Sequence, residues 1–130
     1  MRTKSIFIFA LFSTAVLSYA CSDAASRERT ALSRLTSGGD LLQGKQAIRN
    51  YGCQTCHTIT GVPGARALVG PDLAGFRNRS YIAGQLPNTP ENLMLWIQHP
   101  HAVNPRTVMP EMNVSEEDSR NIAAYLYSLR

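Results

Sequence analysis

The stretch from Tyr51 to Ile59 constrains this chain more than any other, because YGCQTCHTI holds two cysteines and a histidine within five positions. Such a motif has three chemical uses: a pair of redox-active thiols, part of a zinc site, or the attachment point of a haem. Each use needs a different protein around it. The rest of the sequence therefore has to decide among them.

The first twenty residues have the features of a secretory signal peptide. Arg2 and Lys4 precede an apolar run, Ile6 to Val16, and the small residue Ala20 ends the segment. A basic start, a short apolar core and small residues at the cleavage point are typical of such signals. The run is shorter than the ~20 apolar residues that span a bilayer, and an uncleaved N-terminal anchor is the alternative. We therefore predict a signal peptide at 1–20 and an exported bacterial protein, periplasmic or held to the membrane facing the periplasm.

Cys21 would be the first residue of the mature chain. A cysteine at this place also resembles the lipoprotein signal of bacteria, in which that cysteine is acylated. The usual lipoprotein signal has an aliphatic residue three places earlier, where this chain has Ser18, so cleavage with and without acylation both stay open. Acyl chains would hold the protein at the membrane, since each buried methylene adds ~0.8 kcal/mol to membrane affinity.

Residues 21–39 are mostly small and polar and end in two glycines, which predicts a flexible linker before a folded domain at 40–130. The net charge of the chain is +4, and it falls to +2 if Arg2 and Lys4 leave with the signal peptide. A nucleic-acid-binding protein would show a strong basic stripe, which this sequence lacks. We therefore do not expect nucleic acid as a partner.

Three helices are predicted within the domain, each from an N-cap residue followed by apolar residues at helical spacing. They begin at Asp40, Thr89 and Ser115, with Gln43 and Asp118 completing capping boxes in the first and last, and they end at Gly52, Pro100 and Arg130. The stretches 58–88 and 100–114 are rich in Gly and Pro and show no strand pattern. We expect an all-α fold of three to five short helices with long irregular loops. Because three short helices bury little apolar surface, something else must fill the middle.

A haem meets these requirements better than zinc or a thiol pair. A structural zinc needs four ligands, and Cys53, Cys56 and His57 offer three. A redox pair belongs at a strand-to-helix junction, and this chain has no strand pattern. Cys-x-x-Cys-His is the attachment signature of haem c, in which both thiols form thioethers with one porphyrin and the histidine binds the iron as proximal ligand. The largely apolar cofactor would also fill the core.

Met109 is the predicted distal iron ligand. It follows His57 by 52 residues and lies in the irregular stretch TVMPEM, just before the last helix. Thioether sulfur is a soft ligand that raises the reduction potential of haem iron. The alternatives are Met112, His99 or His101 as the ligand, and a methionine that only fills the core.

The motifs GKQAIRNYGCQTCHTI, VGPDL, MP and IAAYLYSL, in this order, resemble those of class I c-type cytochromes with one haem, over roughly residues 40–130. The stretch LPNTPENLMLWIQHPHAVNPRTVMP is similar to the haem-c domain fused to subunit II of some bacterial cytochrome c oxidases. The resemblance implies a small cytochrome c fold wrapped around one covalent haem c. It also implies thioethers at Cys53 and Cys56, His57 as proximal ligand and Met109 as distal ligand.

Three further residues are candidates for the surroundings of the haem. The resemblance implies that the carbonyl of Pro71, in GPDL, accepts a hydrogen bond from His57 Nδ1–H, which would fix the imidazole ring. The guanidinium of Arg79 and the indole N–H of Trp96 could each reach a haem propionate. The alternatives for these two are a solvated loop cation and plain core packing.

Several small residues have structural interpretations. Gly44 and Tyr125 are expected to mark where the first and last helices cross, a small side chain against a large one. Gly61, Gly64 and Gly70 are interpreted as turn residues. A phosphate-binding loop is not expected there, because no helix N-terminus follows them.

A haem protein with these ligands would transfer single electrons and would not be an enzyme itself, because no axial position of the iron stays open to oxygen or peroxide. We predict an electron carrier of a respiratory chain, such as one that ends in a cytochrome c oxidase, with that oxidase or a dehydrogenase as redox partner. One alternative is a fixed electron-input subunit of a membrane oxidase or dehydrogenase complex. Another is a haem-based sensor or enzyme with a labile distal ligand.

Overall fold

The computed structural model describes residues 23–130; the predicted signal peptide at 1–20 and Cys21 lie outside the described residues. Residues 23–35 are helical, so the segment predicted as a flexible linker has regular backbone over much of its length. Ala, Arg, Glu and Leu, which favour helices, make up most of this segment. Its role as a linker stays a prediction. No helix between residues 23 and 130 is long and apolar enough to cross a membrane.

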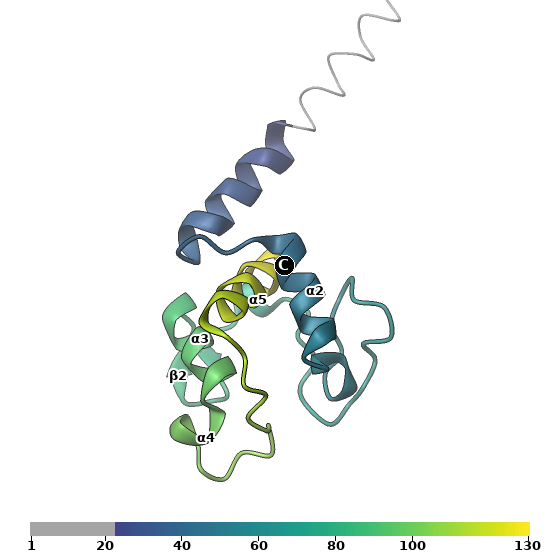
Figure 1. The fold of residues 1–130 in the computed structure, drawn as a ribbon, viewed down its shortest axis with the longest axis vertical. Coiled ribbons are helices and arrows are strands. Elements are labelled where there is room, and N and C mark those ends of the chain that lie inside the picture. Colours follow the sequence, from purple (N-terminus) through teal and green to yellow (C-terminus); the bar gives the residue numbers. More distant parts are fainter. Residues whose placement is uncertain (1–22) are drawn as a thin grey trace, which may run out of the picture. The chain divides into compact units, whose positions relative to one another are not determined.

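Residues Leu32–Arg130 form one compact unit, in which helices alternate with long loops (Figure 1). Its elements in chain order are α2 (Leu41–Asn50), the 3₁₀ helices η1 (Cys53–Thr55) and η2 (Phe76–Asn78), the strands β1 (Tyr81–Ile82) and β2 (Leu86–Pro87), and the helices α3 (Pro90–Gln98), α4 (Pro100–Val103) and α5 (Glu116–Ser128). The three predicted helices correspond to α2, α3 and α5. The predicted all-α class is therefore confirmed.

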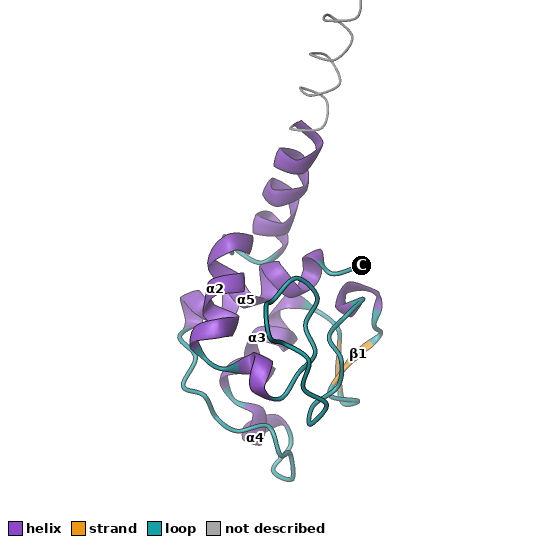
Figure 2. Ribbon diagram, turned by 90° about the vertical axis from the view of Figure 1, so that its right-hand side faces the viewer, coloured by secondary structure: helices purple, strands orange, loops and turns teal. Residues whose placement is uncertain are grey.

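Two small features differ from the sequence prediction: the antiparallel hairpin of β1 and β2, and helix α4. Figure 2 shows the hairpin as a short orange piece among teal loops. Two residues per strand are too few to give a visible alternating pattern, and the hairpin turns through left-handed Ala83 and Gly84, with φ of 51° and 70°. Helix α4 begins at Pro100, the residue predicted to end the second helix. Proline suits the first turn of a new helix as well as the end of an old one.

The predicted N-cap side chains each accept a hydrogen bond from the backbone three residues on. In the two predicted capping boxes, however, the N–H of the N-cap residue donates to another part of the fold and not to the side chain three residues on. Asp40 Oδ1 accepts from the Gln43 N–H at 2.8 Å, and Thr89 Oγ1 accepts from the Asn92 N–H at 3.3 Å. Ser115 Oγ accepts from the Asp118 N–H at 3.1 Å. The Asp40 N–H donates to Asn121 Oδ1 of α5 at 2.8 Å. The Ser115 N–H donates to the hydroxyl of Tyr51, the C-cap residue of α2, at 3.4 Å. Helices α2 and α5 therefore complete each other's N-terminal caps.

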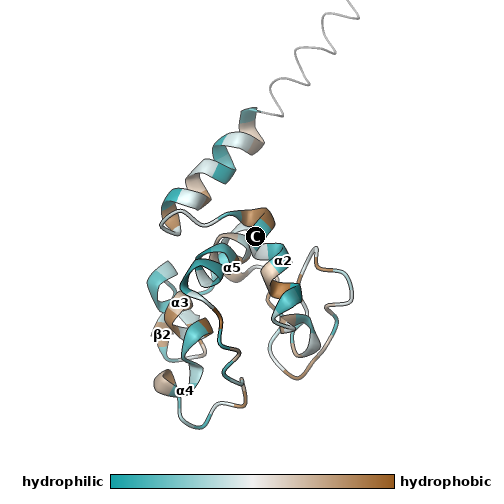
Figure 3. Ribbon diagram, in the orientation of Figure 1, coloured by the Kyte–Doolittle hydropathy of each residue, from teal (hydrophilic) through white to brown (hydrophobic). Residues whose placement is uncertain are grey.

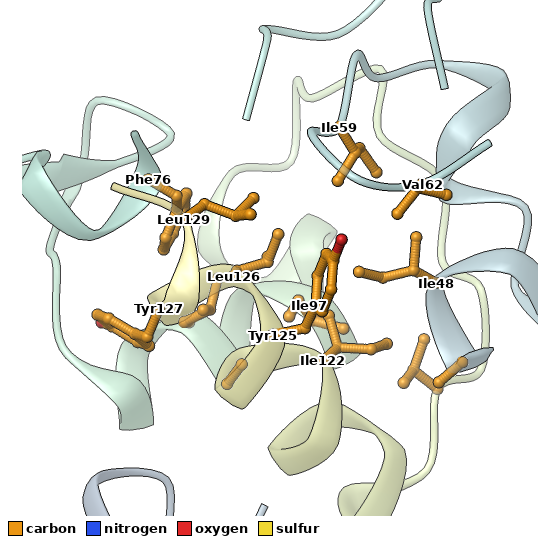
Figure 4. Close-up of a cluster of buried hydrophobic side chains, with 14 of the residues drawn as sticks. Ile48, Ile59, Val62, Phe76, Ile97, Ile122, Tyr125, Leu126, Tyr127 and Leu129 are labelled. Carbon is orange, nitrogen blue, oxygen red and sulfur yellow. The ribbon is translucent and has the colours of Figure 1, made fainter. Parts of the chain in front are cut away.

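Helices α2 and α5 cross with their backbones in contact at Gly44. A Cβ atom placed on Gly44 would lie only 1.9 Å from the carbonyl oxygen of Asn121. The prediction that Gly44 marks the helix crossing is confirmed, but its expected partner is wrong: the atoms nearest Gly44 belong to the backbone of Asn121 and Ile122, and not to Tyr125. Tyr125 belongs to the buried cluster drawn in Figure 4, and its hydroxyl reaches beyond the helices to donate to Thr60 O at 2.7 Å. It thereby fixes the loop that follows His57.

The hydrophobic core joins the three long helices to the loops between them. Figure 3 shows hydrophobic and hydrophilic residues mixed along each helix, as expected when one face is buried and the other meets solvent. The core side chains include Ile48 of α2, Leu93 and Ile97 of α3, Ile122 and Leu126 of α5, Phe76 of η2, and Ile59 from the loop after η1. All of these also line a cavity, so the core is one wall of the candidate site.

Candidate haem site

A cavity of about 370 Å³ opens in the unit Leu32–Arg130, a size within the usual range for small-molecule sites. Most of its wall is apolar. Every site residue predicted from the sequence lines it: Cys53, Cys56, His57, Pro71, Arg79, Trp96 and Met109. Segments separated by up to about half of the chain are thus brought together around one space.

The cysteine motif forms one tight turn at the edge of this cavity. Cys53 begins η1 after Gly52, which has a left-handed φ of 74°. The N–H groups of Cys56 and His57 both donate to Cys53 O, at 3.2 and 3.0 Å, which holds the two thiols and the imidazole close together. Burial raises the pKa of the Cys53 thiol. Redox-active thiols have lowered pKa values, so this environment does not favour a thioredoxin-like pair.

The His57 ring is held from one side. Its Nδ1 lies 2.7 Å from Pro71 O, the contact that the sequence resemblance implied. When Nδ1 carries the proton and donates to this carbonyl, Nε2 keeps its lone pair and can bind a metal. The hydrogen bond therefore selects the tautomer and the orientation that a proximal ligand needs.

Gly70 has a role in the site that the sequence interpretation missed. A Cβ atom at Gly70 would lie 2.3 Å from Cε1 and 2.6 Å from Nδ1 of His57, so the ring occupies the space that any side chain would need. Gly61 and Gly64 have left-handed φ values of 78° and 79°, as turn residues do, whereas Gly70 does not. The turn interpretation fits Gly61 and Gly64, whereas Gly70 lies in a bend without a left-handed φ and has a role beside His57 that this interpretation did not include. The sequence did contain one indication of this role, because Gly70 directly precedes Pro71, the residue expected to hold the His57 ring.

Both methionines of the loop 104–114 line the cavity. The N–H of Met109 donates to Thr107 Oγ1 at 3.1 Å, which fixes the backbone at this residue. Met112 also lines the wall, so it stays the alternative ligand from this loop. His99 and His101 are exposed and are not part of the cavity wall. The geometry thus favours a sulfur ligand over a second imidazole.

Arg79 is a fixed cation at the cavity wall. Its Nη2 donates to the carbonyl oxygens of Asp72 and Ala74, and its guanidinium lies 5.7 Å from the centre of the Phe76 ring. The alternative of a freely solvated loop cation does not describe this arrangement. Trp96 is half-buried at the same wall, and among the described residues its indole N–H has no hydrogen-bond partner. A guanidinium and an open N–H donor suit a ligand that carries carboxylates.

Asn88 orders the turn that carries Arg79, a role that the sequence analysis did not predict. Its Nδ2 donates to the carbonyls of Phe76 and Arg79, at 3.0 and 2.9 Å. Its Oδ1 accepts from the Tyr127 hydroxyl at 2.8 Å. Burial, with a smaller effect of the Glu91 charge, raises the pKa of Tyr127 to about 12, so this donor stays protonated. No local pattern could have indicated a contact between residues this far apart.

The residues present fit a haem c. The wall is mostly apolar, two thiols lie three positions apart at its edge, and an oriented imidazole and a thioether belong to the same wall. The missing side chain at Gly70 makes room for the imidazole. Within residues 23–130, no three side chains of His, Cys, Asp and Glu are grouped as a bare metal ion would require.

The chain belongs to the cytochrome c family, whose model, described as "Cytochrome c", matches residues 41–130. Membership makes haem the expected cofactor and electron transport the expected role. The predicted small cytochrome c fold is thereby confirmed.

The chain is also similar to the protein named cytochrome c oxidase subunit 2 in three bacteria. It is 39% identical to that of Alkalihalophilus pseudofirmus over 89 residues, which cover 68% of this chain and 25% of the relative. For Bacillus sp. strain PS3 the identity is 35%, over 65% of this chain and 25% of the relative. For Bacillus subtilis the identity is 28%, over 71% of this chain and 27% of the relative. The chain thus matches about a quarter of the length of these relatives. No solved structure gave a significant match.

Proposed function

We propose that this protein transfers single electrons by means of one covalently bound haem c, in a respiratory chain that ends in a cytochrome c oxidase. The main support is that the Cys-x-x-Cys-His turn and the Met109 loop line the same cavity. The cytochrome c family and the oxidase relatives support the same role. Bound haem c would supply an iron centre that accepts and releases one electron.

Each site residue has a distinct role in this proposal. Cys53 and Cys56 form the two thioethers, and His57 is the proximal ligand through Nε2, held in orientation by Pro71. Met109 is the distal ligand. If His57 and Met109 both held the iron, they would leave it no open position for a substrate, and the protein would carry electrons without being an enzyme itself.

Arg79 and Trp96 would hold the propionates. The Arg79 guanidinium is already fixed by two carbonyls, so it loses little side-chain freedom when it meets a carboxylate. The indole N–H of Trp96 could donate one hydrogen bond to a propionate. Both groups would lower the cost of bringing the two negative charges of a haem close to an apolar wall.

The rim of the cavity suits a transient redox partner. Val69 and Val108, which lie far apart in the sequence, both line the cavity and are 72% and 86% exposed, and the neighbouring Leu68 is 88% exposed. An exposed apolar patch at the mouth of a cavity often marks an interaction site. We propose that the oxidase or a dehydrogenase docks here through a small contact.

The protein would act in the periplasm, or at the membrane facing it, after removal of residues 1–20. Acylation of Cys21 would then supply a membrane attachment; if residues 1–20 are not removed, the uncleaved N-terminal segment would supply it instead. The alternative of a fixed electron-input subunit predicts stable co-purification with a membrane oxidase or dehydrogenase, whereas a free carrier elutes as a monomer. The sensor or enzyme alternative predicts ready binding of carbon monoxide by the ferrous protein at neutral pH.

Covalent haem is the test of the proposal. We expect the protein from its native membrane fraction to give the pyridine haemochrome spectrum of haem c. Its intact mass should equal the chain without residues 1–20 plus one haem, with or without acyl chains. A colourless protein with two titratable thiols at Cys53 and Cys56 would overturn the proposal.

Met109→Ala tests the distal ligand. We expect the sulfur-to-iron charge-transfer band to be lost completely, the iron to become high-spin or to bind another ligand, and the reduction potential to fall. Met112→Ala is the matched control, because Met112 lines the same cavity from the same loop. Absorption spectra of both ferric variants give the answer. A band that survives in Met109→Ala and is lost in Met112→Ala would assign the role to Met112.

A further inference from the structure

We infer that Tyr51 positions the loop that carries Met109, through a hydrogen-bonded link between the end of α2 and the start of α5. This inference rests on the proposed function, because it concerns the distal ligand of the haem. The link consists of Tyr51, Ser115 and Asp118, and we call it the Tyr51 link. None of the three residues lines the cavity.

The hydrogen bonds of the Tyr51 link connect each of its three residues to the other two. The Tyr51 hydroxyl donates to Asp118 Oδ2 at 2.8 Å and accepts from the Ser115 N–H at 3.4 Å. The Ser115 hydroxyl donates to the same Asp118 oxygen at 2.9 Å and accepts from the Asp118 N–H at 3.1 Å. A hydrogen bond to a carboxylate is stronger than one between neutral groups, so the phenol is firmly held.

The Tyr51 link lies where the Met109 loop needs an anchor. At its start, the loop is held by bonds among Asn104, Arg106, Thr107 and Met109. From Pro110 to Val114, the described structure contains no hydrogen bond that involves the main chain. This end of the loop is held by the Val114 side chain, which is buried, by Met112, which packs against the core, and by the Tyr51 link at Ser115, which supplies the first main-chain hydrogen bond after Met109.

Tyr51 also connects the two halves of the site. It lies two residues before Cys53, at the C-cap of α2, so the segment that bears the haem attachment holds the segment that bears the distal ligand. If the phenol bond is lost, the Cys53–His57 turn keeps its own hydrogen bonds, whereas the Met109 loop loses an anchor. We expect the consequence on the distal side of the haem.

The experiment compares variants of the haem-loaded protein. An added ligand such as imidazole can bind the ferric iron only after Met109 has left it, so its binding rate reports how often the loop opens. We expect Tyr51→Phe to keep the sulfur-to-iron band and to bind imidazole about tenfold faster, because the variant loses the hydrogen bond to the charged Asp118 carboxylate as well as the longer one from the Ser115 N–H. Amide hydrogen exchange in residues 108–115 should also become faster.

Tyr125→Phe is the matched control. It removes a tyrosine hydrogen bond of nearly the same length, 2.7 Å, but one that ends at Thr60 O in the loop after His57. We expect its imidazole rate to equal that of the wild type. If both variants accelerate equally, or if Tyr51→Phe behaves like the wild type, the inference is wrong.

Asp118→Ala gives a second, independent route to the same link. We expect it to accelerate imidazole binding as well, and the double variant with Tyr51→Phe to be no faster than the faster single variant, because both remove one interaction. Glu117→Ala controls for the loss of an acid from the first turn of α5. Fully additive effects would overturn the inference while the proposed function stands. A wild-type holoprotein without the sulfur-to-iron band would overturn both.

Discussion

Replacing Gly70 with alanine is expected to displace the His57 ring and to reduce the yield of low-spin holoprotein by roughly tenfold or more, which corresponds to ~1.4 kcal/mol or more. The new methyl group would lie 2.3 Å from Cε1, whereas carbon atoms in contact stay ~3.5 Å apart or more. The ring would have to move by about 1 Å to restore that separation, and it would give up its bond to Pro71 O. Absorption spectra of the haem-loaded protein, at equal protein concentration, measure the loss.

Gly64→Ala is the control for this substitution. Gly64 has a left-handed φ of 79°, and a Cβ atom there would meet no other atom within 4 Å. We expect a modest loss of stability, ~1–2 kcal/mol from the left-handed backbone, with the spectrum of the iron unchanged. An unchanged spectrum in Gly70→Ala as well would show that His57 does not depend on the missing side chain.

Gly44→Ala is expected to lower the free energy of unfolding by ~3 kcal/mol or more. The methyl group would lie 1.9 Å from the carbonyl oxygen of Asn121, and because that atom is backbone, helix α2 or α5 has to shift as a whole. Helix propensity acts in the opposite direction, since alanine in place of glycine favours a helix by ~1 kcal/mol. The sign of the change therefore distinguishes the two effects.

Urea unfolding followed by circular dichroism measures this change. Leu42→Ala is the control, because Leu42 lies on the same helix with its side chain 58% exposed. We expect its free energy of unfolding to stay within ~0.5 kcal/mol of the wild type. A Gly44→Ala protein that is more stable than the wild type would contradict the close crossing.

The local signals in the sequence predicted the three long helices well. The N-caps at Asp40, Thr89 and Ser115 depend on residues three positions away, so a one-dimensional pattern contains the whole interaction. The Cys-x-x-Cys-His turn is equally local. Five neighbouring residues are therefore enough to indicate its chemistry.

The long-range half of the site could not be predicted in the same way. The contacts of Asn88 with Tyr127, and of Tyr51 with Asp118, join residues that lie far apart in the chain. Only the packing of α5 against α2 and the loops brings these pairs within hydrogen-bond distance. The role of Gly70 was missed for the same reason, because a glycine that makes room for another side chain looks like a turn glycine in the sequence.

The exchange of caps between α2 and α5 has a consequence for how the protein folds. Alone, α2 would begin with the Asp40 amide unbonded, and α5 with the Ser115 amide unbonded, so each helix would fray at its start. Docking supplies both missing acceptors in one event. We therefore expect the two helices to appear together during refolding, and a peptide of either one to be largely unstructured in water.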